Sequence, residues 1–453
     1  MSISPPSHHF LSLGRPSLLN PFPAAAVDTS TVAAADFDVD THTGFMPPDP
    51  PIRRLTGAFT TWEDTLERAT GKLKLGAAVN SDIEREESSR WRESVRQLPV
   101  ISSQPLSRDE RQLRRAHVCL TFIMHFYAHS LPPQESAVSI PAPIAVPLVQ
   151  VSRELGIRPI LTYADTVLWK WSLQDFSKPL SIANVELDGP FTNTPDEAHF
   201  YLTSARIELR GVEALAIMRR SMDELFLGDH LAKRRIARYL CRLAVVVGDL
   251  ASLLMAVREH CDPHVFYHEI RPWFNGGNSH KHGWVYEGVS EAEAETIKAL
   301  GGPSAGQSSL VHALDAFLGV DHTGTAPPKS VPVPIPNPVP QSGDSTFLSR
   351  QQQYMPRHHR AFLQHLASSH SLRDFIHSNT DNQALVQAYD TAVDALKKFR
   401  DGHIRIATLY IVNQAKATVS SSGPGPIRGT GGTALVPFLK EARDNTLKTM
   451  VGK

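Results

Sequence analysis

Apolar residues recur at steps of three and four over most of the chain's second half, the period of an α-helix with one buried face. The clearest case is 231–260, and similar patterns also cover 107–130, 197–216, 356–368, 371–378, 384–412 and 433–450. Residues 162–171 predict a helix that ends in an aromatic cluster, and residues 180–195 predict a loop or a short hairpin. The pattern therefore predicts a mainly α fold.

The same pattern suggests a division of the chain. Residues 1–51 are rich in proline, alanine and serine, and we expect a disordered N-terminal arm there. A smaller N-terminal domain, α or α/β, is expected over 52–190, and a large all-helical domain over 191–453. Within the large domain, the proline-rich stretch 327–346 is expected to be a surface insertion, and 415–432 a flexible loop.

Composition and charge exclude several classes of function. Lysine plus arginine total 46, as do aspartate plus glutamate, and this balance argues against a nucleic-acid or membrane-surface binder. The 3 cysteines show no CxxC spacing, so a disulfide framework and a structural zinc site are not expected. No membrane span is expected, because Gly248 and Asp249 interrupt the best apolar run, 243–257. No secretory signal is evident, which favours a cytoplasmic protein, although 1–35 leaves a mitochondrial presequence open.

One short segment, 262–276, gathers aromatic residues around an arginine. Phe266 and Tyr267 precede Arg271, and Trp273 and Phe274 follow it. A guanidinium donates paired hydrogen bonds to a carboxylate, and the rings offer apolar contact area. The segment therefore suits a planar, apolar ligand that carries a carboxylate. The alternative is an arginine stacked on aromatic rings at the end of a core helix.

The chain contains 21 histidines, so a single histidine is weak evidence of a site. His125, His312, His365 and His403 lie within apolar helical patterns. His403 shares its stripe with Phe399, Ile406 and other apolar residues at helical spacing. Such a stripe can wall one face of a haem, with the histidine as axial ligand. The alternative is a core histidine bonded to a backbone carbonyl.

A glycine-rich loop, Gly429-Thr430-Gly431-Gly432-Thr433, opens the last predicted helix. Free amides at a helix N-terminus bind anions, but no strand precedes the loop and the lysine of a nucleotide-binding loop is missing. A flexible linker capped by Thr433 is the plain alternative.

Four blocks of residues stand in the order found in the indoleamine 2,3-dioxygenase family. They are Phe266, Arg271 and Gly276; residues 304–309 (SAGQSS); Tyr354-Met355-Pro356 with His359-Arg360 and Phe362-Leu363; and the 429–433 loop. The chain resembles this family, in a fungal-type form, over roughly residues 53–450. The resemblance implies a haem b enzyme that uses O2 to open the indole ring of L-tryptophan, giving N-formyl-L-kynurenine. A monomer served by an external reductant is expected, with no nucleic-acid or membrane partner.

The resemblance also assigns residues on both sides of the haem. It makes His403 the proximal iron ligand, supported by an ion pair between Arg400 and Asp315. Arg271 would bind the substrate carboxylate and Phe266 would pack on the indole. The remaining substrate-site positions that it implies are Tyr267, Tyr163, Phe200, Ser204, Ala305 and Thr430.

The resemblance places no acid or base on the oxygen side. Ser204 stands where a globin or peroxidase has a distal histidine, which suits chemistry supplied by the haem and O2. Tyr267 and Tyr201 depart from the family pattern, where phenylalanines are more usual, and a more polar pocket would change substrate affinity. Three alternatives follow: a family member acting on another indoleamine, a haem-binding sensor without turnover, and a helical interaction protein that has lost haem.

Overall fold

The computed structural model describes residues 37–187, 189, 191–322, 346–369, 371–418, 429–431 and 434–452, and it confirms a mainly α fold. The N-terminal helices are α1 (Thr60–Ala69), α2 (Asp82–Arg96), α3 (Glu110–His129) and α4 (Ala142–Leu155). The long central helices are α5 (Pro195–Leu227) and α6 (His230–His260). The remaining helices are α7 (Pro263–Val265), α8 (Glu291–Ile297), α9 (Ser309–Leu318), α10 (Phe347–Gln352), α11 (Arg357–Ser368), α12 (Leu372–His377), α13 (Gln383–Ala407), α14 (Asn413–Thr418) and α15 (Leu435–Lys448).

The strands are few and short. β1 (Val138–Ile140) pairs in parallel with β4 (Trp284–Tyr286), and β2 (Trp171–Ser172) pairs antiparallel with β3 (Glu186–Leu187). The β1–β4 pair joins segments more than a hundred residues apart in the sequence. It therefore ties the chain that follows α7 to the N-terminal helices.

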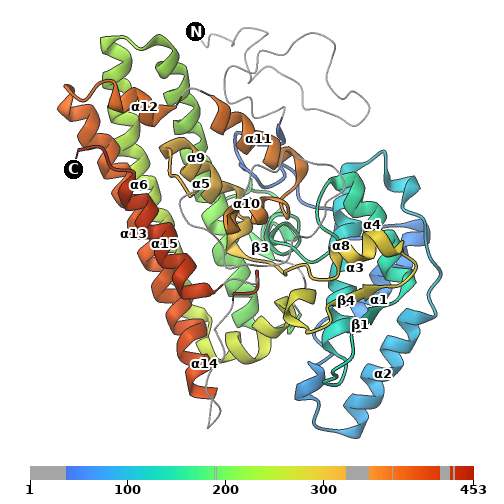
Figure 1. Cartoon of the computed structure of the whole chain (residues 1–453). Helices are drawn as coiled ribbons and strands as arrows, with labels where there is room; N and C mark the ends of the chain where they lie inside the picture. Colours follow the sequence, from blue (N-terminus) through green and yellow to red (C-terminus); the bar gives the residue numbers. More distant parts are fainter. Residues whose placement is uncertain are drawn as a thin grey trace.

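The long helices lie side by side, and the N-terminal helices gather across the molecule from them (Figure 1). α6 packs against both α5 and α13 because its apolar stripe, which includes Ile236, Leu240 and Leu243, is completely buried. α6 is the one helix of the described residues that is long and apolar enough to cross a membrane, by length and composition alone. Here its apolar side faces α5 and α13, as in a core helix of a bundle.

Two hydrophobic cores organise the fold. The bundle core consists of side chains from α5, α6, α9, α11 and α13. The N-terminal core is built on α1, α3 and α4, but it continues past the predicted boundary at residue 190 to take in Phe266, Trp273 and Trp284. The aromatic segment singled out in the sequence is therefore part of the N-terminal core.

Several local expectations need correction. Residues 37–51 do not form a disordered arm, because Phe45 and Met46 are buried and Phe45 packs against Phe362 with ring centroids 5.5 Å apart. Residues 1–36 lie outside the described residues, as does nearly all of the proline-rich insertion 327–346.

Two further segments differ from the prediction. Residues 162–171 form a short π-helix, η6 (Ala164–Leu168), followed by strand β2, because the aromatic end pairs with β3. Within the predicted loop 415–432, helix α14 continues to Thr418, and only 429–431 of the remainder are described.

Candidate active site

The arginine segment begins where α6 ends. Asp262 caps α7 by accepting hydrogen bonds from the backbone N–H groups of His264 and Val265, at 2.8 and 3.1 Å. The chain then forms a π-helix, η7 (Phe266–Ile270), and a 3-10 helix, η8 (Arg271–Phe274). Short π-helical segments often occur at functional sites, and the change of helix type resets which side chains share a face.

The structure places one of the predicted aromatic residues, Tyr267, beside Arg271. The guanidinium carbon of Arg271 lies 5.6 Å from the ring centre of Tyr267. Burial lowers the pKa of Arg271, although an arginine remains cationic. The ring of Phe266 lies 4.7 Å from that of Phe200 on α5 and 5.6 Å from that of Tyr410 beyond α13. Arg271 thus lies beside a phenol, and Phe266 of the same segment packs on aromatic rings from two other parts of the chain.

Two histidines of α3 bind the backbone of the residues that follow Arg271. The backbone carbonyl of Trp273 accepts a hydrogen bond from Nδ1 of His125 at 2.7 Å, and that of Asn275 accepts one from Nε2 of His129 at 2.8 Å. Burial lowers the pKa of His125 to about 3 and that of His129 to about 4, so both rings are neutral. The ring of Phe191 also stacks on that of Trp273, with centroids 5.3 Å apart. These contacts fix the backbone immediately after Arg271.

His403 lies near the end of α13 and is half-buried. On its helix, Phe399 belongs to the bundle core, and Tyr410 just beyond the helix belongs to the N-terminal core. Burial, with a smaller effect of Arg400, lowers the pKa of His403 to about 4, which keeps the imidazole neutral. Within the described part of the chain, no hydrogen bond engages its ring nitrogens. A neutral imidazole with an available nitrogen is what a haem iron takes as an axial ligand, so His403 fits that role.

The other histidines in apolar helices are placed differently. His125 is committed to the Trp273 carbonyl, and Nε2 of His312 lies 2.9 Å from the carbonyl oxygen of Gly306. His365 stacks on Phe37, with ring centres 5.2 Å apart. These contacts give each of them a structural role, which leaves His403 as the best candidate.

The predicted ion pair beside His403 is present. Arg400 donates two hydrogen bonds to Asp315 of α9, at 2.7 and 2.6 Å, and others to the carbonyl of Ala442 and the hydroxyl of Thr446 on α15. Burial opposes ionisation of Asp315, but Arg400 and His322 outweigh it and lower its pKa. The pair therefore joins α9, α13 and α15 one turn before His403.

Tyr163 is buried, and it is held by Glu208, which the sequence analysis did not single out, and by Gln307 of the 304–309 block. Its hydroxyl donates to Oε1 of Glu208 at 2.8 Å, and its backbone N–H donates to Gln307 at 2.8 Å. Ser308 donates to the same oxygen of Glu208 at 2.7 Å. Glu208 follows Ser204 by one turn of α5, so the spacing of Phe200, Ser204 and Glu208 was the signal that could have identified it.

Glu208 is a carboxylic acid in direct contact with Tyr163, one of the predicted site residues. Its side chain is buried, and burial raises its pKa to about 7, although the hydrogen bonds from Ser308 and Tyr163 oppose that rise. Ser204 lies on the same helix and is half-buried, close enough to Tyr163 to affect its pKa. The hydroxyl group of Tyr163 therefore lies between the carboxyl group of Glu208 and Ser204.

The glycine-rich loop rests on the segment before Ala305. The hydroxyl of Thr430 donates to the carbonyl of Pro303 at 2.7 Å, and its own carbonyl accepts from the N–H of Gly302 at 3.3 Å. Gly302 in turn packs so tightly on Phe274 that a Cβ would lie 1.7 Å from the Phe274 carbonyl oxygen. Thr430 is therefore linked through Gly302 to Phe274, at the end of the arginine segment. Ala305, which begins the 3-10 helix η10 (Ala305–Gln307), is exposed.

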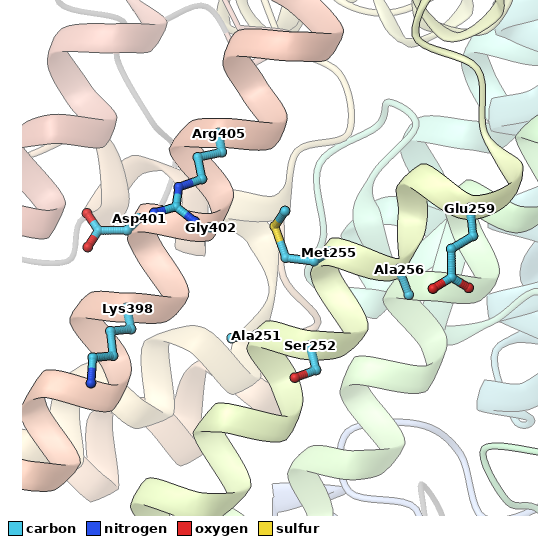
Figure 2. A pocket seen from close by; sticks show the side chains of 9 residues that line it. All are labelled: Ala251, Ser252, Met255, Ala256, Glu259, Lys398, Asp401, Gly402 and Arg405. Atoms are coloured by element: carbon cyan, nitrogen blue, oxygen red, sulfur yellow. The ribbon is translucent and has the colours of Figure 1, made fainter.

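A separate groove runs between α6 and α13 on the outside of the bundle, with a volume of about 490 Å³ (Figure 2). Its lining includes Met255, Glu259, Lys398, Asp401 and Arg405. None of the predicted site residues lines it, although Gly402 directly precedes His403. We therefore do not assign the substrate to this groove.

Comparison with known proteins places the chain. A family model described as "Indoleamine 2,3-dioxygenase" matches residues 33–449. An indoleamine 2,3-dioxygenase of Saccharomyces cerevisiae is 31% identical over 443 residues, covering 91% of this chain and 92% of that protein. "Indoleamine 2,3-dioxygenase 2" of Homo sapiens is 33% identical over 368 residues, covering 79% and 84%. A "6-hydroxytryptophan 2,3-dioxygenase" of Fusarium equiseti is 28% identical over 432 residues, covering 91% and 97%.

These matches, with the helical fold, define the chain as a dioxygenase, an enzyme of the oxidoreductase class. It belongs to the indoleamine 2,3-dioxygenase family, as the resemblance in the sequence predicted. The family is haem-dependent. The names of these relatives differ in substrate, so the family alone does not fix the indole compound that this chain uses.

Proposed function

We propose that this enzyme binds haem b and uses O2 to cleave the indole C2–C3 bond of L-tryptophan, giving N-formyl-L-kynurenine. The observation that carries the proposal is the position of Arg271 beside Tyr267 in a segment whose Phe266 packs on Phe200. When bound, the haem supplies activation of O2. The protein contributes binding, orientation and exclusion of water.

His403 is the residue proposed to hold the haem. Its support is the neutral imidazole on α13 and the absence of a hydrogen bond to the ring among the described residues. Arg400 and Asp315 hold α13 against α9 and α15, so they would fix the orientation of that imidazole.

Arg271 is the residue proposed to bind the substrate carboxylate through paired hydrogen bonds. Phe266 and Phe200 would pack on the indole and exclude water from it. Thr430 would close the site over the amino acid backbone of the substrate, with Tyr163, Ser204 and Ala305 completing the pocket. A monomeric, cytoplasmic enzyme that depends on an external reductant completes the proposal.

The experiment is a turnover assay on the purified, haem-loaded protein with a reductant and O2. The substrate panel is tryptophan, 6-hydroxytryptophan and tryptamine, and the readout is the product's absorbance. Preference for tryptophan supports the proposal. Preference for 6-hydroxytryptophan would replace the substrate and keep the reaction. Binding of haem without turnover of any of the three would contradict the proposal.

A hydroxylated indole is the second candidate, and the hydroxyl group of Tyr267 favours it. This side chain is half-buried beside Arg271, at a position where the family resemblance implies phenylalanine. A phenol there can exchange a hydrogen bond with a ring hydroxyl, which a phenyl ring cannot. Tyr267→Phe separates the candidates, because it should reduce use of 6-hydroxytryptophan and leave use of tryptophan nearly unchanged.

A further inference from the structure

The carboxyl group of Glu208 is the meeting point of two hydroxyl groups from different parts of the chain. Tyr163, beside η6, and Ser308, at the start of α9, both donate to its Oε1. Its other oxygen, Oε2, is buried and has no hydrogen-bond partner among the described residues. The two oxygens of one carboxyl group are therefore in very different environments.

This asymmetry favours a proton on the group. An ionised carboxylate with one unpartnered, buried oxygen loses hydration that nothing replaces. Burial accordingly raises the pKa of Glu208 to about 7. Burial also raises the pKa of Glu197, another buried glutamate on the same helix, but both its oxygens accept backbone N–H bonds that oppose the rise, from Phe191 at 2.9 Å and Thr192 at 2.7 Å.

Close packing of α5 against α9 creates this environment. Gly211 lies three residues after Glu208, and a Cβ at Gly211 would stand only 2.2 Å from a methyl carbon of Leu310. The absence of a side chain at Gly211 lets α9 approach, and the approach places Ser308 against Glu208. Tyr163 lies in the N-terminal core and Leu310 in the bundle core, so Glu208 connects the two cores.

We propose that Glu208 is a positioning residue of the active site, which holds the hydroxyls of Tyr163 and Ser308 and does so more tightly when its carboxyl group is ionised. Hydrogen bonds to an ionised acceptor are roughly twice as strong as those to a neutral one. Tyr163, a residue proposed to complete the pocket, is thus held by a side chain of α5. The effect on turnover rests on the proposed function, whereas the protonation of Glu208 does not.

Few other titratable groups face Glu208. Tyr163 is one, and burial and Glu208 raise its pKa well above its usual value, so it stays protonated. His312, one turn after Ser308 on α9, has a pKa lowered by burial and is neutral at pH 7. Arg206 and Arg210 of α5 bond elsewhere, to the Ile182 carbonyl and to Asp249. Proton exchange near neutrality in this part of the site should therefore belong to Glu208.

The first test is spectroscopic and needs no turnover. Infrared difference spectra of the haem-loaded protein across pH 5–9 should show a protonated carboxyl band that disappears with a midpoint near pH 7. Glu208→Gln should lack that band. Tyr163→Phe and Ser308→Ala should move its midpoint upward, because each removes a hydrogen bond that favours the ionised form. These two variants keep the test valid if Glu208→Gln does not fold.

The second test is the pH profile of kcat/KM for the preferred indole substrate. Wild type should gain activity as pH rises through 7, on the order of tenfold, the value of one charge-assisted hydrogen bond over a neutral one. Glu208→Gln should stay at the low-pH level, with kcat/KM independent of pH in that range and normal haem content. Glu197→Gln is the matched control and should keep the inflection.

Each outcome distinguishes the two proposals. A wild-type protein with no band titrating near pH 7, or variants that leave its midpoint unchanged, would overturn the role of Glu208. A Glu208→Gln enzyme that keeps the wild-type pH profile would overturn it as well. The expected infrared titration with no turnover of any indole would instead refute the proposed function and leave the protonation of Glu208 established.

Discussion

The imidazole of His129 donates a hydrogen bond to the backbone carbonyl of Asn275, four residues after Arg271, at 2.8 Å. A helix from the N-terminal part of the chain thus fixes the segment proposed to bind the substrate carboxylate. The bond is short and spans 146 residues of sequence. It gives the first of four predictions.

His129→Ala should raise KM for the substrate and lower stability by about 1–3 kcal/mol, because the Asn275 carbonyl loses its partner at a half-buried position. The measurements are KM and thermal unfolding. His280→Ala is the matched control, since His280 makes a similar bond to the carbonyl of Gln134 at an exposed position, at 3.3 Å. It should change stability by less than about 0.5 kcal/mol. Equal effects of the two variants would contradict the role of His129.

The protein should lose stability as pH falls from about 6.5 to 4. Burial lowers the pKa of His129 to about 4, below its ordinary value of 6.5, so the unfolded chain takes up the proton first. The contribution of His129 is complete above pH 6.5 and decreases below it, by about 2–3 kcal/mol. Chemical denaturation at several pH values measures this slope. His129→Gln should reduce it, and an unchanged slope would show that other groups cause the acid sensitivity.

His403→Ala should abolish stable haem binding, because it removes the proposed iron ligand. The measurement is the Soret absorbance after reconstitution with haem. His365→Ala on α11 is the control and should keep full haem content. An alanine variant at residue 403 that retains the wild-type spectrum would show that another group binds the iron.

Arg271→Ala should lower kcat/KM for tryptophan while leaving the haem spectrum unchanged. Removing one partner of a buried charged hydrogen bond costs about 2–5 kcal/mol, which is roughly 30- to several-thousand-fold. Arg271→Lys should not restore activity, because an ammonium lacks the planar pair of donors. The preference of wild type for tryptophan over tryptamine, which lacks the carboxylate, should disappear in both variants. Loss of haem from them, or an unchanged preference, would make Arg271 structural.

The helical periods could be predicted from the sequence because they depend on local spacing. The stripe of 231–260 became α6, and the His403 stripe became α13. The spacing of Phe200, Ser204 and Glu208 was equally local, and following it one more turn would have revealed the carboxyl group.

Other features were not predictable from local patterns. The hydrogen bonds from His125 and His129 join residues 148 and 146 positions apart, and no periodicity indicates such a contact. The π-helices at η6 and η7 depend on tertiary packing and lack a distinctive sequence pattern. The prediction for the last part of the arm, residues 37–51, was wrong for another reason: the overall composition of 1–51 hid two large apolar residues, Phe45 and Met46, that are buried.

The extension of the N-terminal core across residue 190 means that the chain cannot be divided there. A fragment ending at residue 190 would leave Phe122 and Phe126 exposed to water, without the Phe191 and Trp273 rings that cover them. The complementary fragment would carry Arg271 on a segment that lacks its hydrogen bonds from His125 and His129. Separate production of the two halves should give aggregation rather than two modules. Mutational scans for foldability and for substrate choice should likewise identify overlapping sets of residues in this core.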